Sequence, residues 1–325
     1  MEVVNILKVI LEEGLMYGIL AIGVYISYSI LDFPDLSVDG TLPFGAIVTG
    51  VLILQGVNPW LCCLIAFLCG AAAGSLTGFL NVRLKIRPLL CGILTMTALL
   101  SINLVICMAG TGGSSIVSFF SRETVFTSFP ATQIPVSVGG VGIRNLVLIL
   151  LIALLCKLLL DAFLKTKAGL LLRAAGDNEQ YVTMLARHPG RSKIIGLAIG
   201  NGFAALAGSV IAQSKESAST SMGTGMVVLG LASVIIGLSL FRRVSFMRAT
   251  TQVLVGTLIY KAALQIALTM GLPTEYRELL MAAIFAVALV GGRLLDKGKN
   301  KGGHGPLISS HFSFGGRRGG HADNG

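Results

Sequence analysis

Charge is scarce in this sequence. Asp, Glu, Lys and Arg make up 12% of its 325 residues, whereas a soluble globular domain contains about a quarter. Hydrophobic residues make up 54%, and their runs are too long and too unbroken for the alternating polar faces of a soluble fold. Runs such as 146–164, 194–212 and 253–270 approach the roughly 20 residues that a helix needs to cross the hydrocarbon core. This composition excludes a soluble fold and predicts an all-α integral membrane protein.

Signatures of enzymes are also missing. The sequence has no GxxxxGK(S/T) nucleotide-binding loop, no HExxH and no GxSxG, so we expect no catalytic residue and no ATP hydrolysis by this chain. The six cysteines lie in apolar segments without the paired spacing of a zinc or redox site. We expect these cysteines to pack against other helices, and we expect no metal and no cofactor.

Glycine, by contrast, is abundant, with 41 residues. It recurs every fourth residue at Gly70, Gly74 and Gly78, and again at Gly196 and Gly200. Lipid gives no hydrophobic drive between helices, and small residues let their backbones approach closely instead. These stripes predict close packing of the helices that carry them.

The net charge of +10 does not indicate a nucleic-acid partner, because the basic residues are spread over short loops and the tail. One set of loops, within 83–87, 165–193 and 242–248, holds twelve Lys and Arg, and the alternate loops hold four. The positive-inside rule places the first set, and with it the C-terminal tail, in the cytoplasm. We therefore predict a multi-pass protein of the cytoplasmic (inner) membrane, surrounded by lipid.

The hydrophobic segments predict a polytopic helical bundle of about 8–9 transmembrane helices, with an outer loop at 110–143 and a cytoplasmic loop at 165–193. We expect residues 1–297 to form this transmembrane domain and the Gly-rich residues 298–325 to form a disordered tail. The predicted helices are 12–30, 60–81, 88–109, 144–164, 193–213, 224–241, 248–270 and 277–293.

Residues 31–55 do not fit a simple transmembrane helix. The segment opens with LDFPDLSVDGTLP, which carries three aspartates and two prolines, and its remainder, 44–54, is too short to span comfortably. We predict a broken or re-entrant half-helix here. If the segment re-enters from outside, the N-terminus lies inside; if it crosses fully, the N-terminus lies outside. The sequence leaves both alternatives open.

Ionisable residues at membrane depth are candidates for a substrate path, because they are costly there unless they face a cavity or a partner. Asp35, Asp39 and Lys261 are the candidates. Alternatively, the two aspartates lie in an outer loop, where they are solvated or dock a binding protein. For Asp39 a further alternative is that it caps the half-helix. Lys261 must reach water, a carboxylate or carbonyl groups, or extend to the interface. Lys157 and Asp161, four residues apart, predict a local ion pair.

The cytoplasmic segment KTKAGLLLRAAGDNEQYVTMLARHPGRSK (165–193) is more than a linker. Residues 173–187 have the composition of a short amphipathic helix, which Gly176 and Asp177 interrupt or cap. Such a helix lies in the headgroup layer or inserts into a groove on a partner protein. The physical properties of the segment do not separate these two uses.

Three stretches resemble a known family. RAAGDNEQYVTMLARHPGRSKIIGLAIGNGFAALAGSVIAQ resembles the signature region of the ATP-binding-cassette (ABC) importer permeases for branched-chain amino acids and simple sugars. LDFPDLSVDGTLPFGAIVTG resembles the segment at the broken second helix of that family, and GSLTGFLNVRLKIRPLLCGILTMTAL resembles the run that follows it. The resemblance covers about residues 15–293 and is fairly specific in combination.

The resemblance implies a membrane-spanning permease subunit of an importer. Its partners would be a cytoplasmic ATPase subunit, an extracytoplasmic solute-binding protein and a second permease copy, as in a homodimer. In this family a cytoplasmic helix docks on the ATPase subunit and transmits its closure. By resemblance, the residues assigned to this coupling are Arg173, Gly176, Asp177, Asn178, Glu179 and Tyr181.

The aspartate-rich opening departs from the sugar permeases, many of which have two glycines where this chain reads Ser37-Val38-Asp39-Gly40. It resembles a less-characterised subgroup associated with amino-acid uptake, aromatic amino acids among them. We therefore expect inward movement of a small organic solute, an amino acid or a related compound. The alternative is an ion-gradient-driven secondary transporter or channel, which needs ionisable or unwound sites in two matching halves. The scarcity of carboxylates in the predicted helices after residue 55 disfavours that alternative.

Overall fold

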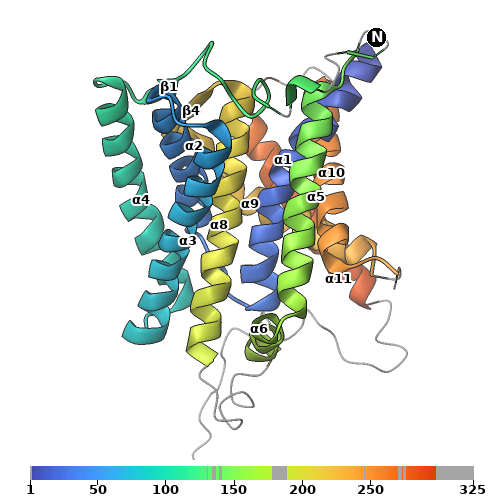
Figure 1. Cartoon of the computed structure of the whole chain (residues 1–325). Helices are drawn as coiled ribbons and strands as arrows, with labels where there is room; N and C mark the ends of the chain where they lie inside the picture. The colour runs from blue at the N-terminus through green and yellow to red at the C-terminus, as the bar shows by residue number, and fades with distance from the viewer. Residues whose placement is uncertain are drawn as a thin grey trace, which may run out of the picture.

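The computed structural model is a bundle whose long helices run roughly along one common direction (Figure 1). Within its described residues, seven helices are long and apolar enough to cross a membrane. The predicted all-α polytopic membrane fold is thereby confirmed. The structure describes residues 2–129, 131–133, 137–138, 141–177, 189–242, 244, 246–269, 273 and 276–297.

The helices follow the hydrophobic segments closely. The α-helices are α1 (Glu2–Tyr25), α2 (Val38–Leu54), α3 (Pro59–Leu84), α4 (Pro88–Thr111), α5 (Arg144–Lys165), α6 (Lys167–Asp177), α8 (Pro189–Lys215), α9 (Met226–Leu240), α10 (Ala249–Thr269) and α11 (Arg277–Lys297). Shorter elements are the π-helix η1 (Ile26–Ile30), the 3-10 helices η2 (Ala131–Gln133) and η3 (Thr220–Gly223), and the strands β1 (Ile116–Ser118), β2 (Ser137–Val138), β3 (Val141–Gly142) and β4 (Ser217–Ser219).

Local sequence signals set several helix ends. Asn58 caps α3, because its side chain accepts a hydrogen bond from the Trp60 N–H at 2.9 Å, and proline occupies the first position of the helix. Helix α3 ends at Lys85, which adopts a left-handed backbone with φ 56°. Proline again opens the next helix, and Gly112 ends it with φ 72°.

Glycine lets the central helices α3 and α8 pack backbone to backbone. A Cβ atom added to Gly70 would collide with Asn201, and one added to Gly74 would collide with the carbonyl of Leu197. Gly78 meets the same helix one turn further along. The stripe predicted from the sequence therefore lies at a helix interface, as expected where small residues bring backbones together.

The break before α2 is present and begins after Ile30, as predicted. Helix α1 continues into η1, the chain unwinds over 31–37, and α2 then runs for 17 residues from Val38. The helix thus includes the apolar remainder 44–54 and begins six residues before it. Pro43 lies inside α2, where its missing N–H removes one intrahelical hydrogen bond without ending the helix.

The arrangement of the helices places the N-terminus. It lies at the end of the bundle that carries β1 and β4, which pair antiparallel, and α6 lies at the opposite end (Figure 1). Helix α2 runs back to the first end, because Gly50 contacts Val117 and Phe119 there. Helix α6 belongs to the basic set of loops, which the positive-inside rule assigns to the cytoplasm. That assignment predicts that the N-terminus lies outside.

Candidate functional site

Helix α6 is an amphipathic helix at the end of the bundle opposite β1 and β4, the end predicted to face the cytoplasm (Figure 1). Thr166 caps it, because the hydroxyl oxygen accepts a hydrogen bond from the N–H of Gly169 at 3.3 Å. The residues buried against the bundle recur every third position, at Gly169, Leu172 and Ala175. The helix therefore begins at Lys167, six residues before the start predicted from the sequence.

The buried face of α6 packs against the end of η1, which continues α1. A Cβ atom on Gly176 would collide with the carbonyl oxygen of Ile30, so only glycine allows this approach. Leu172 and Leu31 both lie over Gly196 of α8. Helix α6 is thus seated on the segment where the first helix breaks, and on α8 beside it.

The opposite face of α6 is exposed. Leu170 is 56% exposed, and Arg173 and Asp177 are exposed on the same side. Of the residues predicted to couple this chain to an ATPase, Arg173 and Asp177 therefore point away from the bundle, whereas Gly176 faces it. The other three, Asn178, Glu179 and Tyr181, lie outside the described residues.

Asp35 fastens the start of α2 to α8. Its Oδ1 accepts hydrogen bonds from the Ser37 N–H at 2.9 Å and from the Ser37 hydroxyl at 2.6 Å, and its Oδ2 accepts one from the Asn201 amide at 2.7 Å. Asn201 in turn accepts a hydrogen bond from Thr41 at 2.8 Å. All four side chains are buried, which makes this network costly to break.

Asp39 joins α2 to α9. Helix α9 starts after Gly225, which has φ +75° and makes no side-chain cap hydrogen bond. The cap comes instead from Asp39, whose Oδ1 accepts a hydrogen bond from the Val227 N–H at 2.7 Å. A carboxylate at a helix N-terminus is stabilised by the partial positive charge there. The sequence suggested that Asp39 caps its own half-helix; the structure instead shows it capping a helix 188 residues away, whereas α2 has no side-chain cap hydrogen bond.

The backbone of α2 also contributes to the contact with the start of α9. Pro43 has no N–H, so the carbonyl of Asp39 is free of its usual intrahelical donor. A Cβ atom on Gly223 would collide with that carbonyl, so η3 packs directly on it. We call this meeting point of two helix starts, made by Asp39, Gly223, Gly225 and Val227, the half-helix junction.

Lys261 of α10 reaches a carboxylate on α1. Its Nζ lies 2.9 Å from Glu13 Oε2 and 3.7 Å from the centroid of the Tyr17 ring. Of the alternatives for this lysine, the carboxylate partner is the one observed. Asp35, Asp39 and Lys261 therefore lie in three separate clusters, and their assignment to a substrate path stays a prediction.

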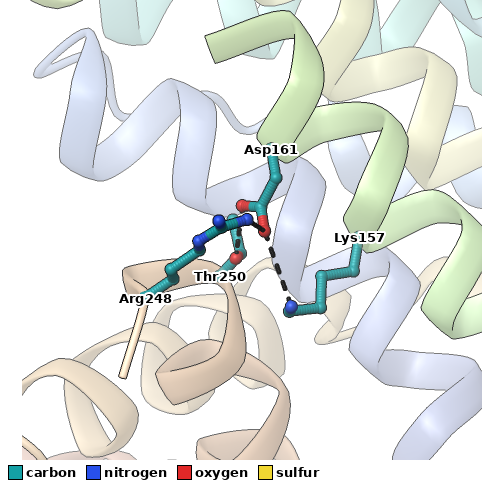
Figure 2. A network of polar contacts seen from close by, with 4 residues as sticks. All are labelled: Lys157, Asp161, Arg248 and Thr250. Atoms are coloured by element: carbon teal, nitrogen blue, oxygen red, sulfur yellow. Dashed lines mark hydrogen bonds and ion pairs between the residues drawn. The ribbon is translucent and has the colours of Figure 1, made fainter. Parts of the chain in front are cut away.

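The predicted pair between Lys157 and Asp161 is confirmed, with Nζ 3.5 Å from Oδ2. The structure adds two partners (Figure 2). Arg248 donates to Oδ2 at 3.0 Å, and the Thr250 hydroxyl donates to Oδ1 at 2.7 Å. This cluster ties the C-terminal part of α5 to the start of α10.

Sequence reasoning missed several members of these clusters. Two of these members are Glu13, a carboxylate in the first apolar segment, and Asn201, an amide between two glycines in a later one. Both were visible as polar residues in apolar surroundings, which require partners at membrane depth. Their partners are far away in the chain, at separations of 248 and 166 residues.

Long apolar helices that enclose discontinuous ones are an architecture found in membrane transport proteins. The chain belongs to the family described as branched-chain amino acid transport system / permease component, whose model matches residues 6–289. The predicted resemblance is therefore confirmed. Members of this family are transport components rather than enzymes, and the chain is a multi-pass inner-membrane protein.

Several relatives agree with this family. The chain is 39% identical to a tyrosine transport system permease protein of Clostridioides difficile, over 88% of this chain and 90% of the relative. It is 30% identical to an uncharacterised protein of Rickettsia prowazekii, over 88% of this chain and 97% of the relative. It is 29% identical to an autoinducer 2 import system permease protein of Salmonella typhi, over 62% of this chain and 54% of the relative. No solved structure matches.

Proposed function

We propose that this chain is the membrane-spanning subunit of an ATP-driven importer that moves an amino acid, of the aromatic class, into the cell. A separate ATPase would supply the energy and a solute-binding protein would deliver the substrate. Family membership supports import by a permease, and the tyrosine transport permease at 39% identity supports the substrate class. The observation that carries the proposal is the pair of opposed faces on α6, one seated on the break after α1 and one exposed.

The exposed face of α6 suits a groove on a partner. Leu170, Arg173 and Asp177 lie on one side of the helix at spacings of three and four residues, which is how an amphipathic helix presents anchors to a groove. The ATPase subunit would bind this face. Both signs of charge beside an apolar anchor would fix the orientation of the docked helix.

Movement of α6 would then reach the half-helix junction. Its Gly176 contacts the carbonyl of Ile30 without space between them, so α6 cannot shift unless the break also shifts. The network of Asp35, Ser37 and Asn201 links this break to the start of α2. Asp39 on α2 in turn holds the start of α9. ATPase closure would thereby change the junction that lies in the interior of the permease.

Two copies of the chain would form the complete permease, with lipid around them. Helices α3, α4 and α5 carry large exposed apolar side chains, such as Leu68, Val105 and Leu155. A surface of this kind requires lipid or another protein. A second copy on part of this surface would place the path for the solute between the two subunits.

The test is uptake by the reconstituted transporter. With the ATPase and the binding protein present, proteoliposomes should take up L-tyrosine only when ATP is supplied. The double variant Arg173→Ala/Asp177→Ala should lower uptake and ATPase copurification about thirtyfold or more, because docking anchors contribute about 1–2 kcal/mol each. The matched control is Arg122→Ala/Glu123→Ala, which removes an exposed pair of the same charges at the outer end.

Two results would contradict the proposal. Tyrosine uptake by this chain without any ATPase, driven by an ion gradient, would favour the secondary transporter. Unchanged uptake and copurification in the α6 double variant would remove α6 from the coupling between the two proteins.

A further inference from the structure

A cavity of about 130 Å³ lies among α1, α2, η3, α9 and α11. One buried water needs about 10–15 Å³, so this space exceeds that of a single solvent molecule by far. Its deep wall consists of the buried side chains of Tyr17, Met226 and Met281. Its rim consists of exposed residues, among them Lys215 and Glu278.

The cavity faces outward and ends at the half-helix junction. Lys215 is the last residue of α8 and is followed by β4 at the outer end, and Glu278 lies in the first turn of α11. The inner limit includes Leu42, one turn after Asp39, and Met226, next to Val227. A solute that enters from outside would therefore stop at the contact between Asp39 and α9.

The lining has the chemistry of a site for a zwitterion with a large apolar side chain. Lys215 at the rim suits a carboxylate, and Glu278 suits an ammonium group. Below them, Met222, Met226 and Met281 offer thioethers, which make favourable contacts with aromatic rings. Tyr17 adds a ring for offset or edge-to-face stacking.

Tyr17 is held in place from behind. The ammonium of Lys261 lies 3.7 Å from the ring centroid and is itself 2.9 Å from Glu13. This contact fixes the orientation of the ring that forms the wall. Lys261 is thus a positioning residue for the cavity, one contact away from the solute.

We propose that this cavity is a binding site of the permease itself for an amino acid with an aromatic or large apolar side chain. Lys215 binds its α-carboxylate, Glu278 binds its α-ammonium, and Tyr17 with the methionines holds its side chain. The site rests on the proposed function and refines it. The permease thereby selects its solute a second time, after the binding protein has released it.

The experiment uses the assembled transporter in nanodiscs, with its ATPase and without the binding protein. The probes are radiolabelled L-tyrosine, tyramine, which lacks the carboxylate, and desaminotyrosine, which lacks the ammonium. Lys215→Gln and Glu278→Gln should each weaken tyrosine binding about tenfold, the loss expected for one charge-assisted hydrogen bond. Lys215→Gln should bind tyrosine no better than tyramine, and Glu278→Gln no better than desaminotyrosine.

Controls separate a charge effect from a folding effect. Arg122→Gln and Glu123→Gln remove exposed charges outside the cavity and should leave binding unchanged. The variant Met222→Cys, treated with a membrane-impermeant thiol reagent, should react more slowly when tyrosine is bound. The six native cysteines are buried or half-buried. Treatment of the parent protein with the same reagent gives their background reactivity.

The outcomes distinguish the site from the function. Normal tyrosine uptake by the complete system, with unchanged binding in Lys215→Gln and Glu278→Gln, would overturn the site and leave the function standing. Failure of the complete system to move any amino acid, while tyrosine still protects Met222→Cys, would overturn the function and keep the site. Equal affinity of the parent protein for all three probes would also overturn the site.

Discussion

Helices α2 and α9 both begin inside the bundle, but their first turns are stabilised in different ways. The start of α2 is held by Asp35 and Ser37, which lie directly before it, together with Asn201 of α8. The start of α9 follows Gly225 and takes its cap from Asp39 of α2. The start of α2 is therefore stabilised largely by residues directly before it in the chain, whereas the start of α9 takes its cap from a residue on another helix. A shift of α2 must therefore disturb α9, and four changes test this difference.

Replacement of Asp35 should have the largest effect. In Asp35→Leu the Ser37 N–H loses its acceptor in a buried place, and a buried group left unpaired costs about 1–3 kcal/mol. The Ser37 hydroxyl and the Asn201 amide lose their shortest hydrogen bonds and keep only the longer ones to Asn201 Oδ1 and the Leu197 carbonyl. We expect a strong fall in the thermal unfolding temperature and in the yield of folded protein. Thermal unfolding in detergent, followed by dye fluorescence, is the measurement.

Asp32→Asn is the control for that experiment. Asp32 is exposed and has φ 51°, a left-handed backbone that Asn adopts readily. Its unfolding temperature should match the parent protein. If Asp35→Leu unfolds at the parent temperature as well, the network around Asp35 does not hold the start of α2.

Replacement of Asp39 separates the hydrogen bond from the charge. Asp39→Leu removes the cap of α9 and should cost about 2 kcal/mol. Asp39→Asn keeps an acceptor for the Val227 N–H and should lose only the interaction with the helix dipole, about 0.3–1 kcal/mol. Unfolding temperature and tyrosine uptake are both measured. Equal behaviour of the two variants would show that the hydrogen bond from α9 to Asp39 is not what matters.

The glycine before α9 should show a smaller effect. Gly225 has φ +75°, and a residue with a side chain costs about 1 kcal/mol in that conformation, so Gly225→Ala should lower stability by this amount. Gly291 is the matched control, because a Cβ atom there meets nothing within 4 Å and the residue lies inside α11. Gly291→Ala should be neutral or slightly stabilising. The reverse order of the two variants would contradict the assigned start of α9.

The polar cluster of Figure 2 should show the smallest effect, because it contacts neither half-helix start. Lys157 lies 3.5 Å from Asp161, which keeps Arg248 and Thr250 when the lysine is removed. Lys157→Met should cost less than about 0.5 kcal/mol and leave uptake unchanged. Loss of uptake without loss of stability would instead place this cluster in the coupling between α5 and α10.

Much of the fold could be predicted from the sequence. The helices are visible because lipid requires long apolar runs, and the break before α2 is visible because Asp and Pro are costly within such a run. The first residues of α2 and α6 were harder to predict. Pro43 and Gly176 looked like interruptions, whereas in the structure they allow a neighbouring backbone to approach. Thr166 was an available cap signal for α6 that composition alone did not reveal.

The candidate site was less predictable than the fold. Lys261 was recognisable as a residue that needs a partner, but the choice of Glu13 depends on how α1 and α10 pack. Asp39 was recognisable as a cap, but the helix that it caps lies far along the chain. The cavity between α1, α9 and α11 has no signature in any one segment, because each wall comes from a different helix.

The sequence by itself determined that this protein crosses the membrane many times, which loops are basic and where the first helix breaks. Those properties follow from transfer free energies and loop charges, which depend on residue types and short spans of chain. The tertiary structure alone decided which buried charges pair, which helix start Asp39 stabilises and where an outward-facing cavity ends. These outcomes depend on distances between segments that are remote in the chain, and only the packing of backbones at small residues sets those distances.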